Sequence, residues 1–437
     1  MSQVSANQGA ESGDKYFIPK LEGVSLADPK VMFNPEPYYR ALRKNAPVYY
    51  DETMNLYLVS RYEDLNEVLY DWETYSQELG YHTLWGQGHR EELIGILERE
   101  GGGYFPDVIA SDPPRHGRIR KLLENAFTAR RLKQLEPQFT RVVEDLVERV
   151  ADKGRADGVA DFALPMTVRF MGEQIGVTED DIEATKIKSW SDAYQAQYSM
   201  MQTREQLIGN AHRIAELQRF VIELVRKRQA SPGDDMISDL INARLDDAEK
   251  PRLTFEELVA LTRTFLIGGN DSISTALTSL LYQVATDAEI ADQLYASIDD
   301  DQTLNRFVEE IIRLEPPVRA LSRITTREVE LNGTVLPKGA QVMVLFASGN
   351  DDETVFDSPR HFDMTRRNLG KHLAFGAGIH RCVGNSLARM EVKVAAREIV
   401  RHLKDIRLAV PKEELVYIPS VAMVMMKSLP LAFSKRG

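Results

Sequence analysis

The only cysteine among 437 residues, Cys382, lies in the glycine-rich stretch FGAGIHRCVG at residues 375–384. A thiolate is a strong, soft metal ligand, and the glycines at 376, 378 and 384 permit tight turns that bring backbone amides close to the sulfur. The stretch VGNSLARMEVKVAAREIV then predicts an amphipathic helix whose N-terminal dipole favours a negative sulfur. His380 and Arg381 beside it suit a bound carboxylate. The pattern is compatible with a metal-binding loop, but taken alone a single cysteine is more often a buried structural residue.

A second stretch with chemical potential, FLIGGNDSIST, lies inside the long apolar segment 255–284. Gly268 and Gly269 each weaken a helix interior by about 1 kcal/mol relative to alanine, which a helix tolerates where another group must approach its backbone. An acid and a hydroxyl follow, Asp271 and Ser272. The alternative is tight helix packing, with this pair bonding locally.

Two pairs of charged residues have helical spacing. Glu310 and Arg313 lie three apart and share a helix face, a pattern that is most often a surface salt bridge. His116 and Arg120 lie four apart, one turn into a helix that starts after two prolines. Taken alone, this second pair is most often the solvated basic start of a helix.

Helices must position most of these residues. Apolar residues recur at three-to-four spacing over 118–130, 135–150, 210–228 and 255–284. Alternation over 49–60 and the turn signals within 331–345 predict a small β part. The glycine-rich segment 79–110 is expected to be irregular, either a lid or a surface loop. We therefore expect a mainly α fold with a minor β part: a flexible tail over 1–20 and one domain over 21–437.

Composition narrows the class of protein. Hydrophobic residues make up 43% and charged residues 27%, as in globular proteins. The net charge of −12 argues against nucleic acid as the main partner. The sequence contains no run of about 20 apolar residues, so a membrane anchor is not expected. Its first 16 residues lack the apolar core of a signal peptide. We expect a cytoplasmic monomer.

The cysteine stretch resembles the haem-binding loop of the cytochrome P450 family, Phe-x-x-Gly-x-His/Arg-x-Cys-x-Gly. Phe375, Gly378, His380, Cys382 and Gly384 stand in register with it. Further motifs follow the family order over about residues 30–430. The resemblance implies a single-domain cytochrome P450 fold with haem b between a long distal helix and the helix after the cysteine loop. Cys382 would then be the axial iron ligand.

The resemblance also implies roles for individual residues. Asp271 and Ser272 would deliver protons, although serine stands where the family usually has threonine. Glu310 and Arg313 would form a buried network with His361, and Asp351, where the family usually has arginine, is taken as surface variation. The residues expected to contact haem are His116, Arg120, Arg323, Phe375, Gly376, His380, Cys382 and Gly384.

The activity implied is that of a monooxygenase acting on O2 and an apolar substrate of small to medium size, by hydroxylation, epoxidation or O-dealkylation. Arg319 is either an anchor for a substrate carboxylate or a surface residue. An H2O2-using peroxygenase of the same fold and a non-catalytic haem-thiolate sensor are the alternatives. The pocket candidates are Trp85, Tyr104, Met200, Met201, Phe265, Leu266, Gly269, Val318, Leu321, Val421 and Ala422.

Electrons are expected from another protein, because no dinucleotide fingerprint follows a predicted strand. The resemblance implies a ferredoxin or a flavodoxin with its NAD(P)H reductase. A basic cluster on this acidic chain would dock such an acidic partner. The cluster comprises Arg115, Arg118, Lys121, Arg130, Arg131 and Lys133.

Overall fold

A computed structural model describes residues 20–84, 88–106, 110–124, 129–177, 184–197, 202–245 and 251–436. Helices account for 58% of the structure, and the strands form small sheets. The expected mainly α fold with a minor β part is therefore confirmed. Residues 1–19 of the expected flexible tail lie outside the described residues.

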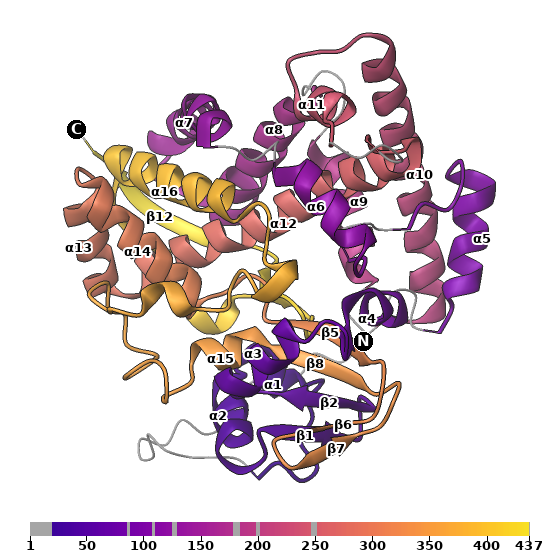
Figure 1. The fold of residues 1–437 in the computed structure, drawn as a ribbon. Coiled ribbons are helices and arrows are strands. Elements are labelled where there is room, and N and C mark those ends of the chain that lie inside the picture. The colour runs from indigo at the N-terminus through magenta and orange to yellow at the C-terminus, as the bar shows by residue number, and fades with distance from the viewer. Residues whose placement is uncertain are drawn as a thin grey trace.

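Helices build most of the molecule (Figure 1). Two of the longest, α10 and α12, follow the N-cap residues Thr203 and Thr254, whose hydroxyls accept the backbone N–H three residues on in a capping box. The α-helices are α1 (Pro29–Phe33), α2 (Glu36–Asn45), α3 (Tyr62–Tyr70), α4 (Gln77–Leu84), α5 (Arg90–Glu100), α6 (Arg115–Glu124), α7 (Ala129–Ala151), α8 (Leu164–Gln174), α9 (Ala184–Ala196), α10 (Arg204–Ala230), α11 (Met236–Asn242), α12 (Phe255–Thr286), α13 (Ala288–Ser297), α14 (Asp301–Leu314), α15 (Phe346–Asn350) and α16 (Asn385–His402).

The periodic segments fold largely as predicted. Segments 135–150, 210–228 and 255–284 lie within α7, α10 and α12. In the segment 118–130, residues 118–124 lie in α6 and residues 129–130 in α7, and residues 125–128 lie outside the described residues. The expectation of irregular structure over 79–110 is wrong where α4 and α5 form. In α5, Leu93, Ile96 and Leu97 are buried at helical spacing, and this packing outweighs the nearby glycines.

The main sheet has the strand order β1-β2-β8-β5-β3, with β2 and β8 parallel and the other pairs antiparallel. The predicted hairpin over 49–60 is the β1–β2 pair. Asn332 and Gly333, with φ of 47° and 75°, form the turn between β6 and β7. The strands are β1 (Val48–Asp51), β2 (Leu56–Val59), β3 (Tyr75–Ser76), β4 (Arg155–Asp157), β5 (Ala320–Thr325), β6 (Val329–Leu331), β7 (Thr334–Leu336), β8 (Gln341–Leu345), β9 (Leu403–Leu408), β10 (Tyr417–Ile418), β11 (Met425–Met426) and β12 (Pro430–Lys435).

The long helix α12 passes through the middle of the helical part, while the β-rich part lies at one end of the molecule (Figure 1). α12 contacts α8, α9, α10 and α16, and most of its residues are buried. Its 32 residues span about 48 Å at 1.5 Å per residue. This helix and the segment leading into α16 enclose the candidate site.

Candidate active site

Cys382 lies in a short loop between the 3-10 turn η3 (Gly378–His380) and α16. Gly376 and Gly378 both have φ of 65°, a left-handed conformation that favours glycine. A Cβ atom on Gly378 would lie 2.2 Å from the carbonyl oxygen of Leu69, so only glycine lets the loop pack against the end of α3. The Cys382 N–H donates to the Phe375 carbonyl at 2.9 Å. The loop is thus tightly folded.

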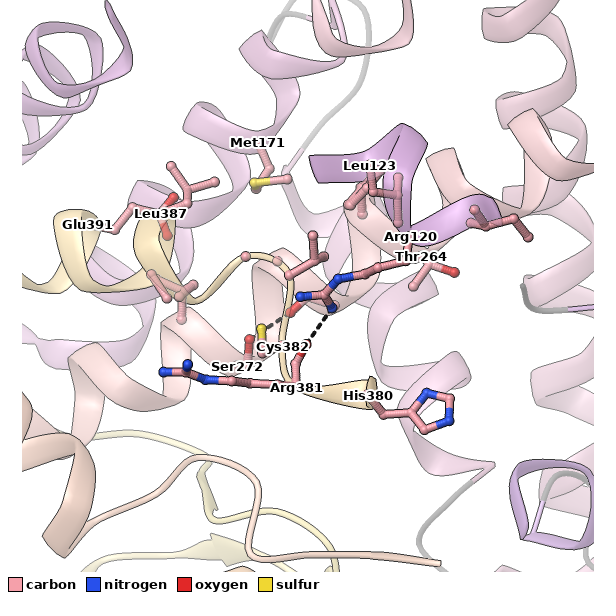
Figure 2. Close-up of a pocket in the computed structure, with 18 of the residues that line it drawn as sticks. Arg120, Leu123, Met171, Thr264, Ser272, His380, Arg381, Cys382, Leu387 and Glu391 are labelled. Carbon is pink, nitrogen blue, oxygen red and sulfur yellow. Dashed lines mark hydrogen bonds between the residues drawn. The ribbon is translucent and has the colours of Figure 1, made fainter. Parts of the chain in front are cut away.

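Opposing influences act on the Cys382 thiol. The side chain is exposed at the cavity wall, yet desolvation by the surrounding protein atoms raises its pKa, while a hydrogen bond from the Gly384 N–H lowers it. The charges of Arg120, Arg389 and Arg381 also lower it, and Figure 2 shows Arg120 reaching toward the loop. The net pKa is raised, so the protein alone keeps the sulfur protonated. Coordination to a metal cation would remove this proton.

Two adjoining cavities meet at Cys382. The smaller one, of about 210 Å³, is bounded by α6, α8, α12 and the start of α16 (Figure 2). The larger one, of about 400 Å³, extends to α4, α9 and β5. Most of their wall residues are apolar. The cavities adjoin because they share wall residues, namely Thr264, Gly268, Ser272, Ile273, His380, Cys382 and Ala388.

Four of the expected haem contacts bring nitrogen donors to these cavities. Arg323 is 3% exposed, and burial lowers its pKa to about 10. Its Nη1 donates to the neighbouring Ser322 carbonyl at 2.9 Å. The His116 and His380 rings lie 4.4 Å apart, and burial lowers the pKa of His116 to about 4. Arg120 pairs with Glu124 at 2.9 Å.

The donor set fits the two carboxylates of haem. Both ring nitrogens of His380 are buried without a hydrogen-bond partner in the described part of the chain. Asp112 is 3.8 Å from Nε2, too far for a hydrogen bond. Buried donors without acceptors are costly, and a group carrying two carboxylates would satisfy them. Cys382, Phe375, Gly376 and Gly384 line the same cavities.

Asp271 and Ser272 are neighbours on α12 but face different surroundings. Ser272 lies on the wall of both cavities, and its hydroxyl donates to the Gly268 carbonyl at 2.6 Å. Asp271 is 5% exposed and accepts a hydrogen bond from the Ser191 hydroxyl of α9. Burial raises the pKa of Asp271 to about 6. Gly269 packs against Met171, whose Cε would lie 2.9 Å from an added Cβ atom.

The ion pair predicted between Glu310 and Arg313 is present and fully buried, with Nε–Oε2 at 2.6 Å. Its third member is Arg366, whose Nε lies 3.0 Å from Glu310. The assignment of His361 is therefore wrong: this residue is exposed and contributes only its backbone carbonyl, which accepts from Arg366. The imidazole of His361 could not replace the guanidinium of Arg366, because only the guanidinium has enough N–H groups to donate to a carboxylate and several carbonyls at once. Asp351 is not surface variation either, since it is buried 3.5 Å from Arg360.

The pocket candidates divide into three groups. Phe265 and Gly269 line the smaller cavity, and Val318, Leu321 and Ala422 line the larger one. Three do not line either cavity: Leu266 and Val421 are packed in the core, and Tyr104 holds Arg90 through its hydroxyl at 3.1 Å. Trp85, Met200 and Met201 lie outside the described residues.

Sequence analysis missed two features of the cavity walls. The hydroxyls of Tyr81 and Tyr194 meet at 2.6 Å on the larger cavity; they are 113 residues apart, and no local pattern links them. Glu391 lines the smaller cavity, and within the described residues neither carboxylate oxygen has a hydrogen-bond partner. Burial raises its pKa well above the usual range. Glu391 could have been predicted from the sequence, because it lies three residues after Ala388 and so shares the helix face that lines the cavity.

The basic residues proposed for docking differ in whether they already pair with an acid of this chain. Arg118 and Arg115 approach Glu257, and Arg131 lies 3.5 Å from Asp234. Lys121, Arg130 and Lys133 are exposed.

Arg319 is neither an anchor for a substrate carboxylate nor a free surface residue. Its Nη1 donates to the Met32 carbonyl at 2.8 Å, and it does not line the two cavities. It instead joins the start of β5 to the N-terminal segment.

Comparisons with known proteins agree with this geometry. Residues 105–431 match the sequence profile described as Cytochrome P450. The chain is 31% identical over 410 residues to the cytochrome P450 monooxygenase PikC of Streptomyces venezuelae, covering 92% of each chain. It is 32% identical over 344 residues to a steroid C26-monooxygenase of Mycobacterium tuberculosis, covering 77% of this chain and 90% of that one. Among the described residues, every helix is too short or too polar to cross a bilayer.

Solved structures show the same fold. The structure of cytochrome P450 CREJ in complex with (4-ethylphenyl) dihydrogen phosphate superposes with a TM-score of 0.83 at 28% identity, covering 92% of this chain and 98% of that one. Sequence profile, relatives and fold thus agree with a loop that presents one cysteine to a cavity ringed by nitrogen donors. The chain belongs to the cytochrome P450 family, and it is a monooxygenase whose cofactor is haem b.

Proposed function

We propose that this enzyme inserts one atom of O2 into an apolar organic molecule of small to medium size by hydroxylation, epoxidation or O-dealkylation, with electrons from a separate redox protein. The observation that carries the proposal is Cys382 on the shared wall of two mainly apolar cavities. Haem, when bound, supplies the activation of O2, whose second atom leaves as water. The names of relatives support such substrates, since they include a steroid C26-monooxygenase and 6-deoxyerythronolide B hydroxylase.

In this proposal the Cys382 thiolate would bind the haem iron, and the residues around it would hold the rest of the cofactor. Phe375, Gly376 and Gly384 line the cavities beside Cys382 and would pack against the cofactor. His116, Arg120, Arg323 and His380 would hold the carboxylates of haem; of these residues, Arg323 and His380 are buried with few acceptors nearby. Charge-assisted hydrogen bonds of this kind are about twice as strong as neutral ones.

The part of the larger cavity away from Cys382 holds the substrate. Val318, Leu321 and Ala422 lie on its wall with Ile267 and Ala276 of α12. Such walls bind a ligand mainly by burying its apolar surface, at about 25 cal/mol per Å². They also exclude water from the reacting carbon. The paired hydroxyls of Tyr81 and Tyr194 add a polar spot to this wall.

Ser272 and Asp271 move protons in this proposal. The Ser272 hydroxyl lies on the cavity wall and can give its proton after turning away from the Gly268 carbonyl. Asp271, with its pKa raised to about 6, can hold and release a proton near neutral pH. Because its side chain bonds Ser191 instead of lining the cavities, Asp271 acts through Ser272 or through water.

The redox partner is an acidic ferredoxin or flavodoxin that docks on the surface near α6 and the start of α7. Lys121, Arg130 and Lys133 are exposed there and positive on a chain of net charge −12. Electrostatic complementarity of this kind raises association rates.

The absorption spectrum of the dithionite-reduced protein under carbon monoxide tests the central assignment. Wild type is expected to show the strongly red-shifted Soret band of thiolate-ligated haem, and Cys382→Ala is expected to lose it. Arg381→Ala, which changes the neighbouring residue, is the matched control and should keep the band. A wild type without this band, or a Cys382→Ala protein that retains it, overturns the proposal.

A second candidate is a peroxygenase that takes H2O2 directly. The observation in its favour is Ser272, whose hydroxyl is engaged by the Gly268 carbonyl and lacks the methyl group that restrains threonine. Turnover with H2O2 alone that exceeds turnover with ferredoxin and its reductase would favour this candidate. A haem-thiolate sensor would bind apolar ligands and oxidise none of them under either condition.

A further inference from the structure

We propose that Glu309 and Arg389 form a clamp that holds both ends of the loop 375–382 and so fixes the orientation of Cys382 toward the haem iron. The inference rests on the proposed role of Cys382 as axial ligand. Neither residue lines the two cavities, so both would be positioning residues. Their contacts reach the loop both where the chain leaves Cys382 and where it enters.

Glu309 and Glu310 are consecutive on α14, and consecutive helical residues point about 100° apart. Glu310 therefore serves the network with Arg313 and Arg366, while Glu309 faces α16. Glu309 and Arg389 have 16% and 27% of their side-chain surface exposed. The two acids anchor different segments of the chain.

Beyond the cysteine, the clamp reaches Cys382 through two hydrogen bonds in series. The Nε and Nη2 atoms of Arg389 donate to the two Glu309 oxygens at 2.6 and 2.7 Å, a forked pair. Nη1 of the same guanidinium donates to Asn385 Oδ1 at 2.8 Å. The Asn385 amide in turn donates to the Cys382 carbonyl at 2.6 Å. The peptide plane after the cysteine is thus tied to α14.

Before the cysteine, Glu309 holds the chain through His372, whose side chain is 1% exposed. The Ala374 N–H donates to His372 Nδ1 at 3.2 Å, so the ring proton lies on Nε2, which donates to Glu309 Oε1 at 2.9 Å. Arg389 also stacks on Phe375, with its guanidinium carbon 4.3 Å from the ring centroid. Phe375 is the residue whose carbonyl accepts the Cys382 N–H.

The clamp is charged at every working pH. Burial raises the pKa of Glu309, but hydrogen bonds from Arg389 and His372 outweigh it and hold this pKa at about 2. A glutamine at position 309 would keep the shape of the side chain and remove the charge that orients both donors. The guanidinium has no second carboxylate in the described structure to replace it.

The test compares Glu309→Gln and Arg389→Gln with Asp301→Asn. Asp301 also joins α14 to α16, through Arg397 and Lys393, but at the opposite end of α14 from Glu309. The reduced, CO-bound haem proteins are followed at fixed temperature, and the rate at which the thiolate-type Soret band converts to the band of haem without thiolate is measured. Loss of one charge-assisted contact should speed this conversion about tenfold in both clamp variants. Asp301→Asn should match wild type.

A conservative variant and the reduction potential of the haem complete the test. Arg389→Lys keeps a charge for Glu309 but not the fork to Asn385, so its conversion rate should lie between those of wild type and Arg389→Gln. The reduction potential of the haem should shift in the clamp variants and stay unchanged in Asp301→Asn. Wild-type conversion rates in both clamp variants, or equal acceleration by Asp301→Asn, would overturn the inference. A wild type without the thiolate band overturns the proposed function instead.

Discussion

At the scale of single residues, Asp271 couples the protonation of α12 to protein stability. Its pKa is about 6 in the folded protein because of burial, against about 3.9 in an unfolded chain. The folded state therefore binds this proton more tightly. Below pH 4 the stabilisation is complete, and it is lost as the pH rises through 6.

We therefore predict that Asp271→Asn changes the pH dependence of stability. Wild type should lose up to about 3 kcal/mol through this group between pH 4 and 6, and the variant should lack this loss. Denaturation midpoints in urea at pH 4.5, 5.5 and 6.5 measure the difference. Asp292→Asn, which changes an exposed acid of α13, is the control. Parallel pH profiles for wild type and Asp271→Asn would contradict the prediction.

The hydroxyl residue at position 272 should control the fraction of NAD(P)H oxidation that leads to product. A threonine has a more restricted χ1 angle than serine, so Ser272→Thr should raise product formed per NAD(P)H and lower H2O2 release. Ser272→Ala should lower product per NAD(P)H by about tenfold or more. Simultaneous measurement of product, cofactor consumption and peroxide decides the matter. If all three proteins release the same fraction of peroxide, Ser272 has no role in proton delivery.

At the scale of elements, the segment 351–366 depends on the buried charges of α14. Arg366 donates to Glu310 and to three backbone carbonyls. Arg366→Gln should therefore lower the free energy of unfolding by about 3 kcal/mol. His361→Ala, at the exposed position first assigned to this network, should change it by less than about 0.5 kcal/mol. Thermal unfolding of both variants provides the measurement, and equal losses would refute the assignment of Arg366.

The cysteine loop depends on one glycine in particular. Gly378→Ala would place a Cβ atom 2.2 Å from the Leu69 carbonyl at a residue with φ of 65°. We expect a loss of at least about 2 kcal/mol and weaker retention of haem. Gly370→Ala, whose Cβ would meet no atom within 4 Å, should be close to wild type. Haem content after gel filtration, together with the unfolding midpoint, tests both variants; normal haem content in Gly378→Ala would contradict the prediction.

At the scale of the whole molecule, the docking proposal depends on charge placed on one face. Reversal of Lys121 and Lys133 to glutamate should slow reduction by an acidic ferredoxin about tenfold at low ionic strength. The salt dependence of the rate should also flatten. Reversal of the exposed Lys44 and Lys338, in the β-rich part (Figure 1), should do neither. Stopped-flow reduction at several salt concentrations distinguishes the pairs, and equal effects from both would sink the docking proposal.

Sequence reasoning reached the features that local patterns encode. The cysteine loop, the long helix with Asp271 and Ser272, and the Glu310–Arg313 pair each lie within a few residues or one helical repeat. It failed where contacts join distant segments. Arg366 meets Glu310 across 56 residues of mostly irregular chain, and Tyr81 meets Tyr194 across 113. It also misjudged 79–110, because the glycines there hide the apolar spacing of α5.

The two adjacent acids of α14 constrain how this protein can be recombined with its relatives. Glu309 requires Arg389, Asn385 and His372, whereas Glu310 requires Arg313 and Arg366. A crossover between Leu314 and Arg366 separates both acids from partners, and one between Arg366 and Asn385 still separates Glu309 from Arg389. Chimeric enzymes should therefore inherit residues 301–402 as one block, and crossovers before α14 are the safer choice for exchanging the cavity walls that α4, α9 and α12 contribute.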